Sequence, residues 1–263
     1  MSFLFVNPRS GDGRPTVDEL VDAARARGVG VHVLERGDDV AALASTVDAT
    51  ALGIAGGDGS LGAVAGVALD RHLPFVCIPF GTRNHFARDA GLDPDDPIAA
   101  LDAYGGRERR IDAGRIGDRL FLNNVSLGAY AHLVRRRERA RRRSEALARL
   151  SALGIALRRP PALELAFAGE RHEVAVLLIS NNAYSLEFVS LGERKRLDEG
   201  ALHLYFTERL IPWRWEERAG PRFDLDAVYA KVSVAIDGEP AELEPPIDVR
   251  IEPLALRLLQ PKP

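Results

Sequence analysis

The segment of the sequence best suited to chemistry is glycine-rich and reads Ala55-Gly-Gly-Asp-Gly-Ser60. It follows a short apolar run and precedes a helical pattern, so its backbone amides would lie at the N-terminus of a helix. Glycines let amides approach a phosphate closely, and a helix N-terminus supplies partial positive charge. The segment therefore predicts a phosphate-binding loop that carries one carboxylate, Asp58.

Two other interpretations of the same glycines stay open at this point. Gly57-x-Gly59-x-x-Gly62 also matches the dinucleotide-binding pattern. It follows the third apolar run rather than the first, however, and Pro79-Phe-Gly-Thr82 stands where an acidic residue would hold a ribose. Both facts count against a dehydrogenase. The other alternative is a turn that only permits tight packing between a strand and a helix.

Two further loops of small and polar residues follow apolar runs. Asn7-Pro-Arg-Ser-Gly11 follows the first run, and Pro79-Phe-Gly-Thr-Arg-Asn84 follows the fourth. Because parallel strands end at one edge of a sheet and ligands bind at this edge, we expect the three loops to form one site.

A later motif, Asp237-Gly-Glu239, follows the apolar run 232–236. An Asp-Gly pair after a strand is most often a hairpin turn. Pairs of asparagines such as Asn123-Asn124 and Asn181-Asn182 also occur in turns and bulges for structural reasons alone. Taken alone, these residues do not establish a catalytic role.

The elements that would position the loops alternate between strands and helices in the first part of the chain. Thr16 and Glu19 have the spacing of a capping box, and Gly28 supplies a C-terminal stop. Such alternation predicts a mainly parallel, Rossmann-like sheet. The predicted strands are 3–6, 29–34, 51–55 and 74–78, and the predicted helices are 16–27, 39–46, 61–70 and one that begins at Asp96-Pro97.

From about residue 109 the pattern becomes rich in strands. We expect an α/β domain over residues 1–110 and a β-rich domain over 111–263, with a helix of about 130–157 inserted in it. The predicted strands are a hairpin of 109–116 and 119–126, followed by strands near 162–168, 172–180, 201–207, 231–236 and 247–259.

Composition narrows the class of protein. With 263 residues, of which 46% are hydrophobic and 28% charged, the chain is long enough for a compact enzyme and is not of disordered type. Its one cysteine, Cys77, lies in an apolar stretch, which excludes a disulfide framework. The first residues lack a basic leader, and no segment is long and apolar enough to span a bilayer. We therefore expect a cytoplasmic protein, and the net charge of -3 argues against general nucleic-acid affinity.

In this order and spacing, the three loops resemble the catalytic domain of the diacylglycerol kinase family, which is related to sphingosine, ceramide and NAD kinases. The resemblance implies a Rossmann-like α/β N-terminal domain, a C-terminal β-sandwich-like domain and an ATP cleft between them. The residues that carry it are Asn7-Pro-x-Ser-Gly11, Gly56-Gly-Asp-Gly-Ser60, Pro79-x-Gly-Thr-x-Asn84, Leu122-Asn-Asn-Val-Ser-Leu-Gly128, Ser180-Asn-Asn182, Asp198-Glu-Gly200 and Asp237-Gly-Glu239.

The resemblance also implies a reaction and a role for each motif. A lipid hydroxyl would attack the γ-phosphorus of ATP directly, a transfer that depends on positioning and charge neutralisation. Asp58 would help to hold Mg²⁺ or the reacting centre, and Asp237 and Glu239 would complete the cleft. Asp237 is the preferred acceptor of the hydroxyl proton, with Asp58 as the alternative. Contacts with the nucleotide are implied for Asn7, Ser10, Gly11, Gly56, Gly57, Gly59, Ser60, Gly81, Thr82 and Asn84.

Two residues depart from the family pattern. His85 stands where the family commonly has Asp, and Glu199-Gly200 stands where the family has an Asp-Gly pair. We predict Asp58 and Glu199 as metal ligands, since hard cations prefer carboxylate oxygens. The leading interpretation is a kinase that converts diacylglycerol or a similar lipid to phosphatidic acid or its analogue. The alternatives are a kinase for a sphingoid base, another lipid alcohol or NAD, and an inactive regulator that binds nucleotide or lipid.

The segment 135–143 contains seven arginines and one acidic residue, Glu138. A solvated helix is one interpretation of this run. The other is docking on anionic lipid headgroups, where each basic residue contributes about 1 kcal/mol near the surface. No aromatic residues interleave with the run, which argues against a nucleic-acid partner. We expect peripheral association with the inner face of the membrane, while a homodimer is left open. The arginines are Arg135, Arg136, Arg137, Arg139, Arg141, Arg142 and Arg143.

Overall fold

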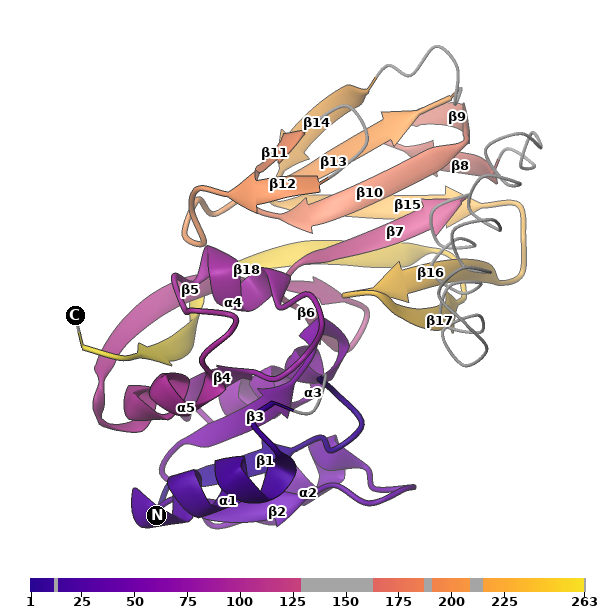
Figure 1. The fold of residues 1–263 in the computed structure, drawn as a ribbon. Helices are drawn as coiled ribbons and strands as arrows, with labels where there is room; N and C mark the ends of the chain where they lie inside the picture. The colour runs from indigo at the N-terminus through magenta and orange to yellow at the C-terminus, as the bar shows by residue number, and fades with distance from the viewer. Residues whose placement is uncertain (12–13, 129–162, 187–190, 209–214, 263) are drawn as a thin grey trace.

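A computed structural model shows a mixed α/β protein, and it describes residues 1–11, 14–128, 163–186, 191–208 and 215–262. The N-terminal part is built on a parallel sheet in the strand order β2-β1-β3-β4 (Figure 1). Every residue of β3 and β4 is buried, because helices cover both faces. The strands are β1 (Phe3–Val6), β2 (Gly30–Val33), β3 (Leu52–Gly56) and β4 (Phe75–Pro79).

The helices lie on the two faces of this sheet. On one face, α1 (Val17–Ala26), α5 (Pro97–Ala100) and the 3₁₀-helix η1 (Leu101–Gly105) share a core with the sheet, and α2 (Val40–Thr46) and α3 (Asp58–Asp70) share another core on the opposite face. The capping box predicted for α1 is confirmed. Glu19 N donates to Thr16 Oγ1 at 3.2 Å, and Thr16 N donates to Glu19 Oε2 at 2.8 Å.

The last strand of the chain connects the N-terminal sheet to the β-rich part. β18 (Ile247–Gln260) pairs in parallel with β4 near its C-terminal end, and antiparallel with β5 (Arg107–Ile116) and β15 (Arg222–Ala227). One sheet therefore continues through the position where the sequence suggested a boundary between 1–110 and 111–263, and that boundary stays a prediction. The same sheet also contains β6 (Arg119–Phe121), β8 (Leu163–Phe167) and β9 (Glu170–Val174).

A second, antiparallel sheet has the order β14-β13-β10-β7-β16-β17 and faces β5, β8, β15 and β18 across a shared apolar core. Figure 1 shows this pair of sheets above the N-terminal α/β part. The second sheet contains β7 (Asn124–Gly128), β10 (Val176–Asn181), β13 (Leu202–Thr207), β14 (Glu216–Gly220), β16 (Val232–Ile236) and β17 (Glu239–Leu243), and a separate hairpin consists of β11 (Tyr184–Leu186) and β12 (Leu191–Arg194).

Three expectations for local structure were wrong. The predicted strand 119–126 is two strands in different sheets, because the amides of residues 122–124 bind the Asp237 carboxylate instead of a neighbouring strand. The predicted strand 172–180 is likewise divided between β9 and β10. The third helix begins at Asp58 rather than residue 61, and a short helix that was not predicted, α4 (His85–Asp89), follows β4.

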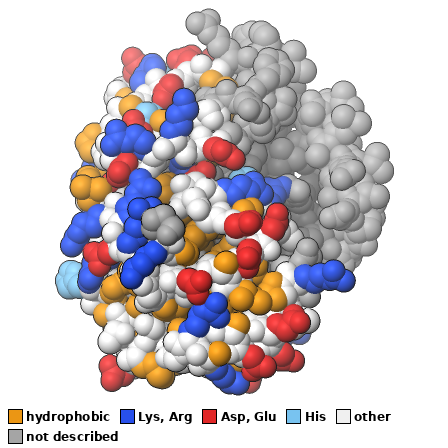
Figure 2. Space-filling model, turned by 60° about the vertical axis from the view of Figure 1, so that its left-hand side comes forward, with side chains coloured by type: hydrophobic (Ala, Val, Ile, Leu, Met, Phe, Trp, Pro, Cys, Tyr) orange, Lys and Arg blue, Asp and Glu red, His pale blue; other side chains and the backbone are white. Residues whose placement is uncertain are grey.

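The predicted helix of about 130–157, with its seven arginines, lies outside the described residues. None of the helices in the described part of the chain is both long and apolar enough to cross a membrane. On the face shown in Figure 2, acidic and basic side chains of the described residues are interspersed, with apolar side chains between them.

Candidate active site

The three predicted loops meet at the carboxyl edge of the parallel sheet. A Cβ on Gly81, after β4, would collide with the backbone of Gly57, after β3. A Cβ on Gly11, after β1, would lie 3.2 Å from the carbonyl oxygen of Phe80. Only glycine allows backbones to approach so closely, and this explains why small residues recur in all three loops.

The N-terminus of α3 projects into this meeting point. Its N-cap is Gly57, which makes no side-chain hydrogen bond to the helix, so the amides of the first turn are not capped by a side chain. Ser60 Oγ donates to the Gly57 carbonyl at 2.8 Å within that turn. An uncapped N-terminus beside glycine loops is a favourable place for a phosphate group.

Asp58, the first residue of α3, is held by three donors. Its Oδ2 accepts from His85 N at 3.1 Å, and its Oδ1 accepts from Phe86 N at 3.0 Å and from Asn123 Nδ2 at 3.1 Å. The first two donors belong to α4, while Asn123 comes from the segment between β6 and β7. The carboxylate is therefore fixed between the N-terminal and the β-rich parts of the protein.

Asp237 lies in the turn between β16 and β17 with φ 47°, and it is only 8% exposed. Its carboxylate accepts from Leu122 N at 2.8 Å, Asn123 N at 2.8 Å and Asn124 N at 3.0 Å. Burial raises the pKa of Asp237 to about 7, because a buried anion loses its hydration. The three amide donors oppose the rise and the charge of Asp58 adds to it.

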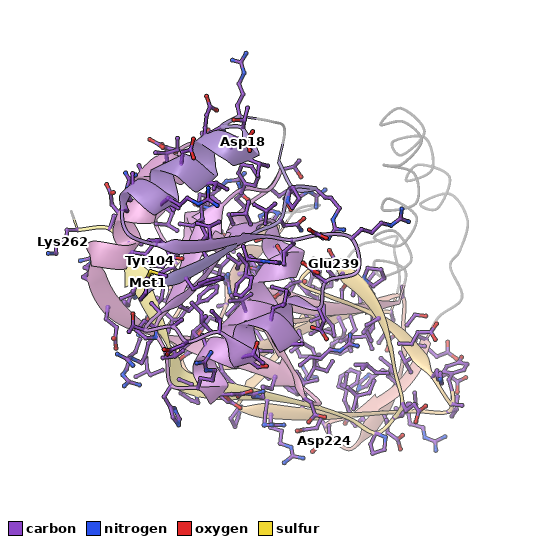
Figure 3. All side chains as sticks on the ribbon, turned by 90° about the horizontal axis from the view of Figure 1, so that it is seen from below. Met1, Asp18, Tyr104, Asp224, Glu239 and Lys262 are labelled. Carbon is purple, nitrogen blue, oxygen red and sulfur yellow. The ribbon has the colours of Figure 1, made fainter. Side chains whose placement is uncertain are left out.

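Glu239 reaches the same helix end from β17. Gly59 carries no Cβ at a point where one would collide with the Glu239 carboxylate, so this carboxylate lies against the first turn of α3. A Cβ on Gly62 would lie 3.7 Å from Asp237 Oδ2. In Figure 3, Glu239 lies where the N-terminal helices meet the strands of the β-rich part. Three carboxylates, those of Asp58, Asp237 and Glu239, thus gather around the start of one helix.

Residues 1–116 match the family model of the diacylglycerol kinase catalytic domain. The chain carries a diacylglycerol kinase catalytic domain. It is a kinase, and therefore a phosphotransferase, as the motifs predicted. The matched residues of the kinase domain include Asp58, whereas Asn123, Asp237 and Glu239 come from the rest of the chain.

One relative is similar to this chain over nearly its whole length, and another over less than half of it. A YegS-like lipid kinase of Klebsiella pneumoniae (strain 342) is 28% identical over 269 residues, covering 91% of this chain and 89% of that protein. A diacylglycerol kinase of Mycobacterium tuberculosis (strain CDC 1551 / Oshkosh) is 36% identical over 122 residues, which cover 43% of this chain and 39% of that protein. A solved structure of a diacylglycerol kinase from Bacillus anthracis (strain Sterne) has a TM-score of 0.69 at 14% identity, covering 98% of this chain and 96% of that one, and it supports the fold alone.

Two of the polar side chains predicted to bind nucleotide in the kinase domain are used within their own loops. Asn84, left-handed at φ 49° and 6% exposed, accepts from Gly81 N at 2.9 Å and donates to the carbonyls of Gly81 at 2.9 Å and Pro94 at 3.3 Å. Asn7 Oδ1 accepts from Arg9 N at 3.1 Å. Both side chains therefore stabilise the conformation of the loops that form the predicted phosphate site. In the same loops, Thr82 is exposed and Ser10 is half-buried.

The two departures from the family pattern have different surroundings. His85 gives its backbone amide to Asp58, and burial lowers the pKa of its imidazole, which is therefore neutral at pH 7. Glu199 accepts from Ala183 N at 3.0 Å and pairs with His203 Nε2 at 3.1 Å. Both oxygens of Glu199 thus contact protein groups. Its role as a metal ligand beside Asp58 stays a prediction.

Sequence reasoning missed the buried ion pair between Arg194 and Asp89. Arg194 Nε lies 2.6 Å from Asp89 Oδ2, and their side chains are 0% and 3% exposed. In the sequence, Arg194 begins the run Arg-Lys-Arg196, which is typical of a solvated surface, and Asp89 ends a short helix that was not predicted. No local signal distinguishes such a pair, because its partners are 105 residues apart.

Proposed function

We propose that the protein transfers the γ-phosphate of MgATP to a hydroxyl of diacylglycerol or a closely similar lipid, with phosphatidic acid or its analogue as product. The observation that carries the proposal is the gathering of Asp58, Asp237 and Glu239 around the N-terminus of α3, where the glycine loops after β1 and β4 also meet. A phosphate-binding helix end that faces several carboxylates suits a phosphate donor that arrives with a divalent cation.

The residues of the chain divide the work of such a transfer. The amides of the glycine loops and of the first turn of α3 would bind phosphate oxygens. Asp237, with a pKa raised to about 7, can exist in either protonation state near neutral pH, which suits an acceptor of the hydroxyl proton. Asp58 is held in place by three donors and serves as the alternative acceptor.

The donor set fits Mg²⁺ bound together with the nucleotide rather than a resident metal. In the described residues no group of three or more His, Cys, Asp or Glu side chains is arranged to hold an ion. Mg²⁺ is commonly held by one or two carboxylates together with substrate phosphates, and Asp58 and Glu239 could supply these carboxylates. When bound there, the ion would neutralise charge on the phosphates that are being separated.

Two further candidates belong to the same geometry. The relatives named as lipid kinases favour a lipid acceptor, and a sphingoid base, another lipid alcohol or NAD remain acceptors to be compared directly. The neutral His85 beside Asp58 is the observation that favours an inactive nucleotide-binding regulator, because a carboxylate is missing at the place where the family commonly has one.

The test is transfer of labelled γ-phosphate from MgATP to diacylglycerol, ceramide and sphingosine in mixed micelles, with NAD as a soluble acceptor. We expect labelled phosphatidic acid from the wild type and none from Asp58→Asn or Asp237→Asn. Asp102→Asn is the matched control, since Asp102 is exposed and its ion pair in the described part of the chain is with Arg27, on the far side of the sheet. Labelling of another acceptor alone would change the substrate, and ATP binding without labelled product would favour the regulator.

We also propose that the protein works on the inner face of the cytoplasmic membrane as a peripheral protein. The support is the arginine-rich segment 135–143, which lies outside the described residues, together with the lipid nature of the proposed substrate. At low salt, binding to vesicles that contain anionic lipid should fall when these arginines are replaced by glutamine. Equal binding of the two proteins would remove this part of the proposal.

A further inference from the structure

Arg194 is a completely buried cation at the junction of the two parts of the protein. It lies at the end of β12, and its side chain is 0% exposed. Its ion pair with Asp89 reaches the last residue of α4, the helix whose first two amides bind Asp58. A buried arginine needs both a counter-ion and hydrogen-bond acceptors, because losing its hydration is costly.

The guanidinium finds these acceptors on two segments, the one between β6 and β7 and the end of β10. Nη1 donates to the carbonyls of Leu122 at 2.5 Å and Asn181 at 3.0 Å, and Nη2 donates to Asn123 Oδ1 at 2.7 Å. The flat face of the group lies 5.3 Å from the ring centre of Tyr184. This planar fork, with donors at fixed angles, is a geometry that lysine cannot reproduce.

The contact with Asn123 determines which end of its carboxamide faces Asp58. A guanidinium only donates hydrogen bonds, so it must face the carboxamide oxygen and not the nitrogen. The nitrogen then points the other way and donates to Asp58 Oδ1 at 3.1 Å. Without the guanidinium the carboxamide could turn over, and its oxygen would then repel the Asp58 carboxylate. The backbone amide of the same Asn123 donates to Asp237, so this one residue contacts both acidic groups.

We propose that Arg194 is a positioning residue of the phosphoryl transfer, which acts through Asn123 to hold the Asp58 carboxylate in its working orientation, with Asp89 balancing its charge. The inference rests on the proposed role of Asp58. Arg194 itself touches neither the glycine loops nor the start of α3 among its contacts, so its effect should appear in kcat rather than in the KM for ATP.

A double-mutant cycle on kcat tests this mechanism. Arg194→Gln is made together with Asp89→Asn, so that no unpaired charge stays buried. We expect this pair of substitutions to lower kcat about 10-fold or more, since a small misplacement of a catalytic group has effects of that size. In an Asn123→Ala background the same pair should change kcat by less than about 2-fold, because the intermediary is already absent. An equal loss in both backgrounds would show that Arg194 does not act through Asn123.

Arg115→Gln is the matched control for a purely structural effect. Arg115 is also largely buried and bridges two elements, through Glu252 at 2.6 Å and Asp70 at 2.7 Å, but it lies at the other end of α3. It should lower the melting temperature and leave kcat within about 2-fold of the wild type. For each variant, the loss of kcat is compared with the loss of melting temperature. If this ratio is the same for the Arg194 and Arg115 variants, the loss of kcat follows from lower stability alone and the proposal fails.

Hydrogen exchange supplies a result that does not depend on activity. In the variant with Arg194→Gln and Asp89→Asn, the amides of His85 and Phe86, which bind Asp58, should exchange faster, while those of α1 should not change. If the wild type phosphorylates none of the acceptors, the proposed function fails. The exchange rates of the His85 and Phe86 amides would still test whether Arg194 affects the surroundings of Asp58. Unchanged exchange at residues 85–86 would overturn that link.

Discussion

The carboxylate of Glu239 lies against Gly59, so a residue of the β-rich part closes directly on the first turn of α3. The contact requires glycine, because any Cβ at position 59 would occupy the space of the carboxylate. Since Glu239 is separated from Gly59 by most of the chain, the proposed catalytic surface is complete only when the two parts are folded together.

Gly59→Ala should therefore impair activity without unfolding the protein. The added Cβ meets Cγ, Cδ and Oε1 of the flexible Glu239 side chain and no backbone atom among its nearest neighbours, so Glu239 would move aside while the helix forms as before. Replacing a helical glycine by alanine even favours the helix by up to about 1 kcal/mol. We expect kcat to fall at least about 10-fold with an unchanged or higher melting temperature.

Gly66→Ala on the same helix is the control, since its Cβ would make an ordinary contact of 3.5 Å with Leu120. Equal activity of the Gly59 and Gly66 variants would show that the place of Glu239 does not matter for turnover.

Gly81→Ala should separate nucleotide binding from catalysis. Its Cβ would collide with the backbone of Gly57, which cannot turn away as a side chain can, so the loops after β3 and β4 must move apart. We expect the dissociation constant for ATP to rise about 10-fold or more, which corresponds to about 1.4 kcal/mol of binding free energy.

Isothermal titration with ATP measures this change directly. Gly105→Ala is the control, because nothing lies within 4 Å of its added Cβ. Unaltered ATP binding by the Gly81 variant would mean that the meeting of these two loops is not part of the nucleotide site.

The local elements of the N-terminal part were predictable from sequence because short-range chemistry determines them. Thr16 and Glu19 cap α1 as their spacing indicated, and β1 has the predicted bounds. The convergence of the three glycine loops followed from a general property of parallel sheets. In contrast, Asn123 was interpreted as a turn residue or as part of a family motif, with no role of its own at the site, although its side chain and its backbone contact two different carboxylates.

What could not be predicted depends on contacts between residues far apart in the chain. The break between β6 and β7 arises because Asp237 binds three amides that lie more than one hundred residues before it. The pairing of β18 with β4 joins the end of the chain to its first third. Neither feature leaves a periodic signal in the sequence, because the hydrogen-bond donors and acceptors of each contact come together only in the folded state.

The buried position of Asp237 predicts opposite effects of pH on stability and on activity. Its pKa is about 7 in the folded protein and 3.8 as the reference value for an exposed group. The folded state therefore retains a proton that the unfolded state loses between about pH 4 and pH 7, so the contribution of Asp237 to stability falls as the pH rises through this window. If Asp237 accepts the hydroxyl proton, kcat/KM should rise with pH and level off above about pH 7.

Two pH series check this prediction. Chemical unfolding of the wild type and Asp237→Asn from pH 4 to pH 8 should show the wild type losing stability relative to the variant as the pH rises. A constant difference between the two proteins would contradict the raised pKa. A rate profile that is flat across pH 7 would instead remove Asp237 as the proton acceptor and leave Asp58 as the candidate.

His85→Asp should make the protein more dependent on a divalent cation for stability and more responsive to it in activity. The neutral imidazole of His85 adds no charge beside Asp58, whereas a carboxylate there would repel Asp58 in the absence of a cation and attract a cation in its presence. With EDTA present, the melting temperature of the variant should lie below that of the wild type, and addition of MgATP should reduce or reverse the difference. The Mg²⁺ concentration that gives half-maximal turnover should also fall.

His72→Asp is the control, because His72 is exposed and lies beyond the far end of α3. A difference in melting temperature that MgATP leaves unchanged would show that position 85 does not face the cation.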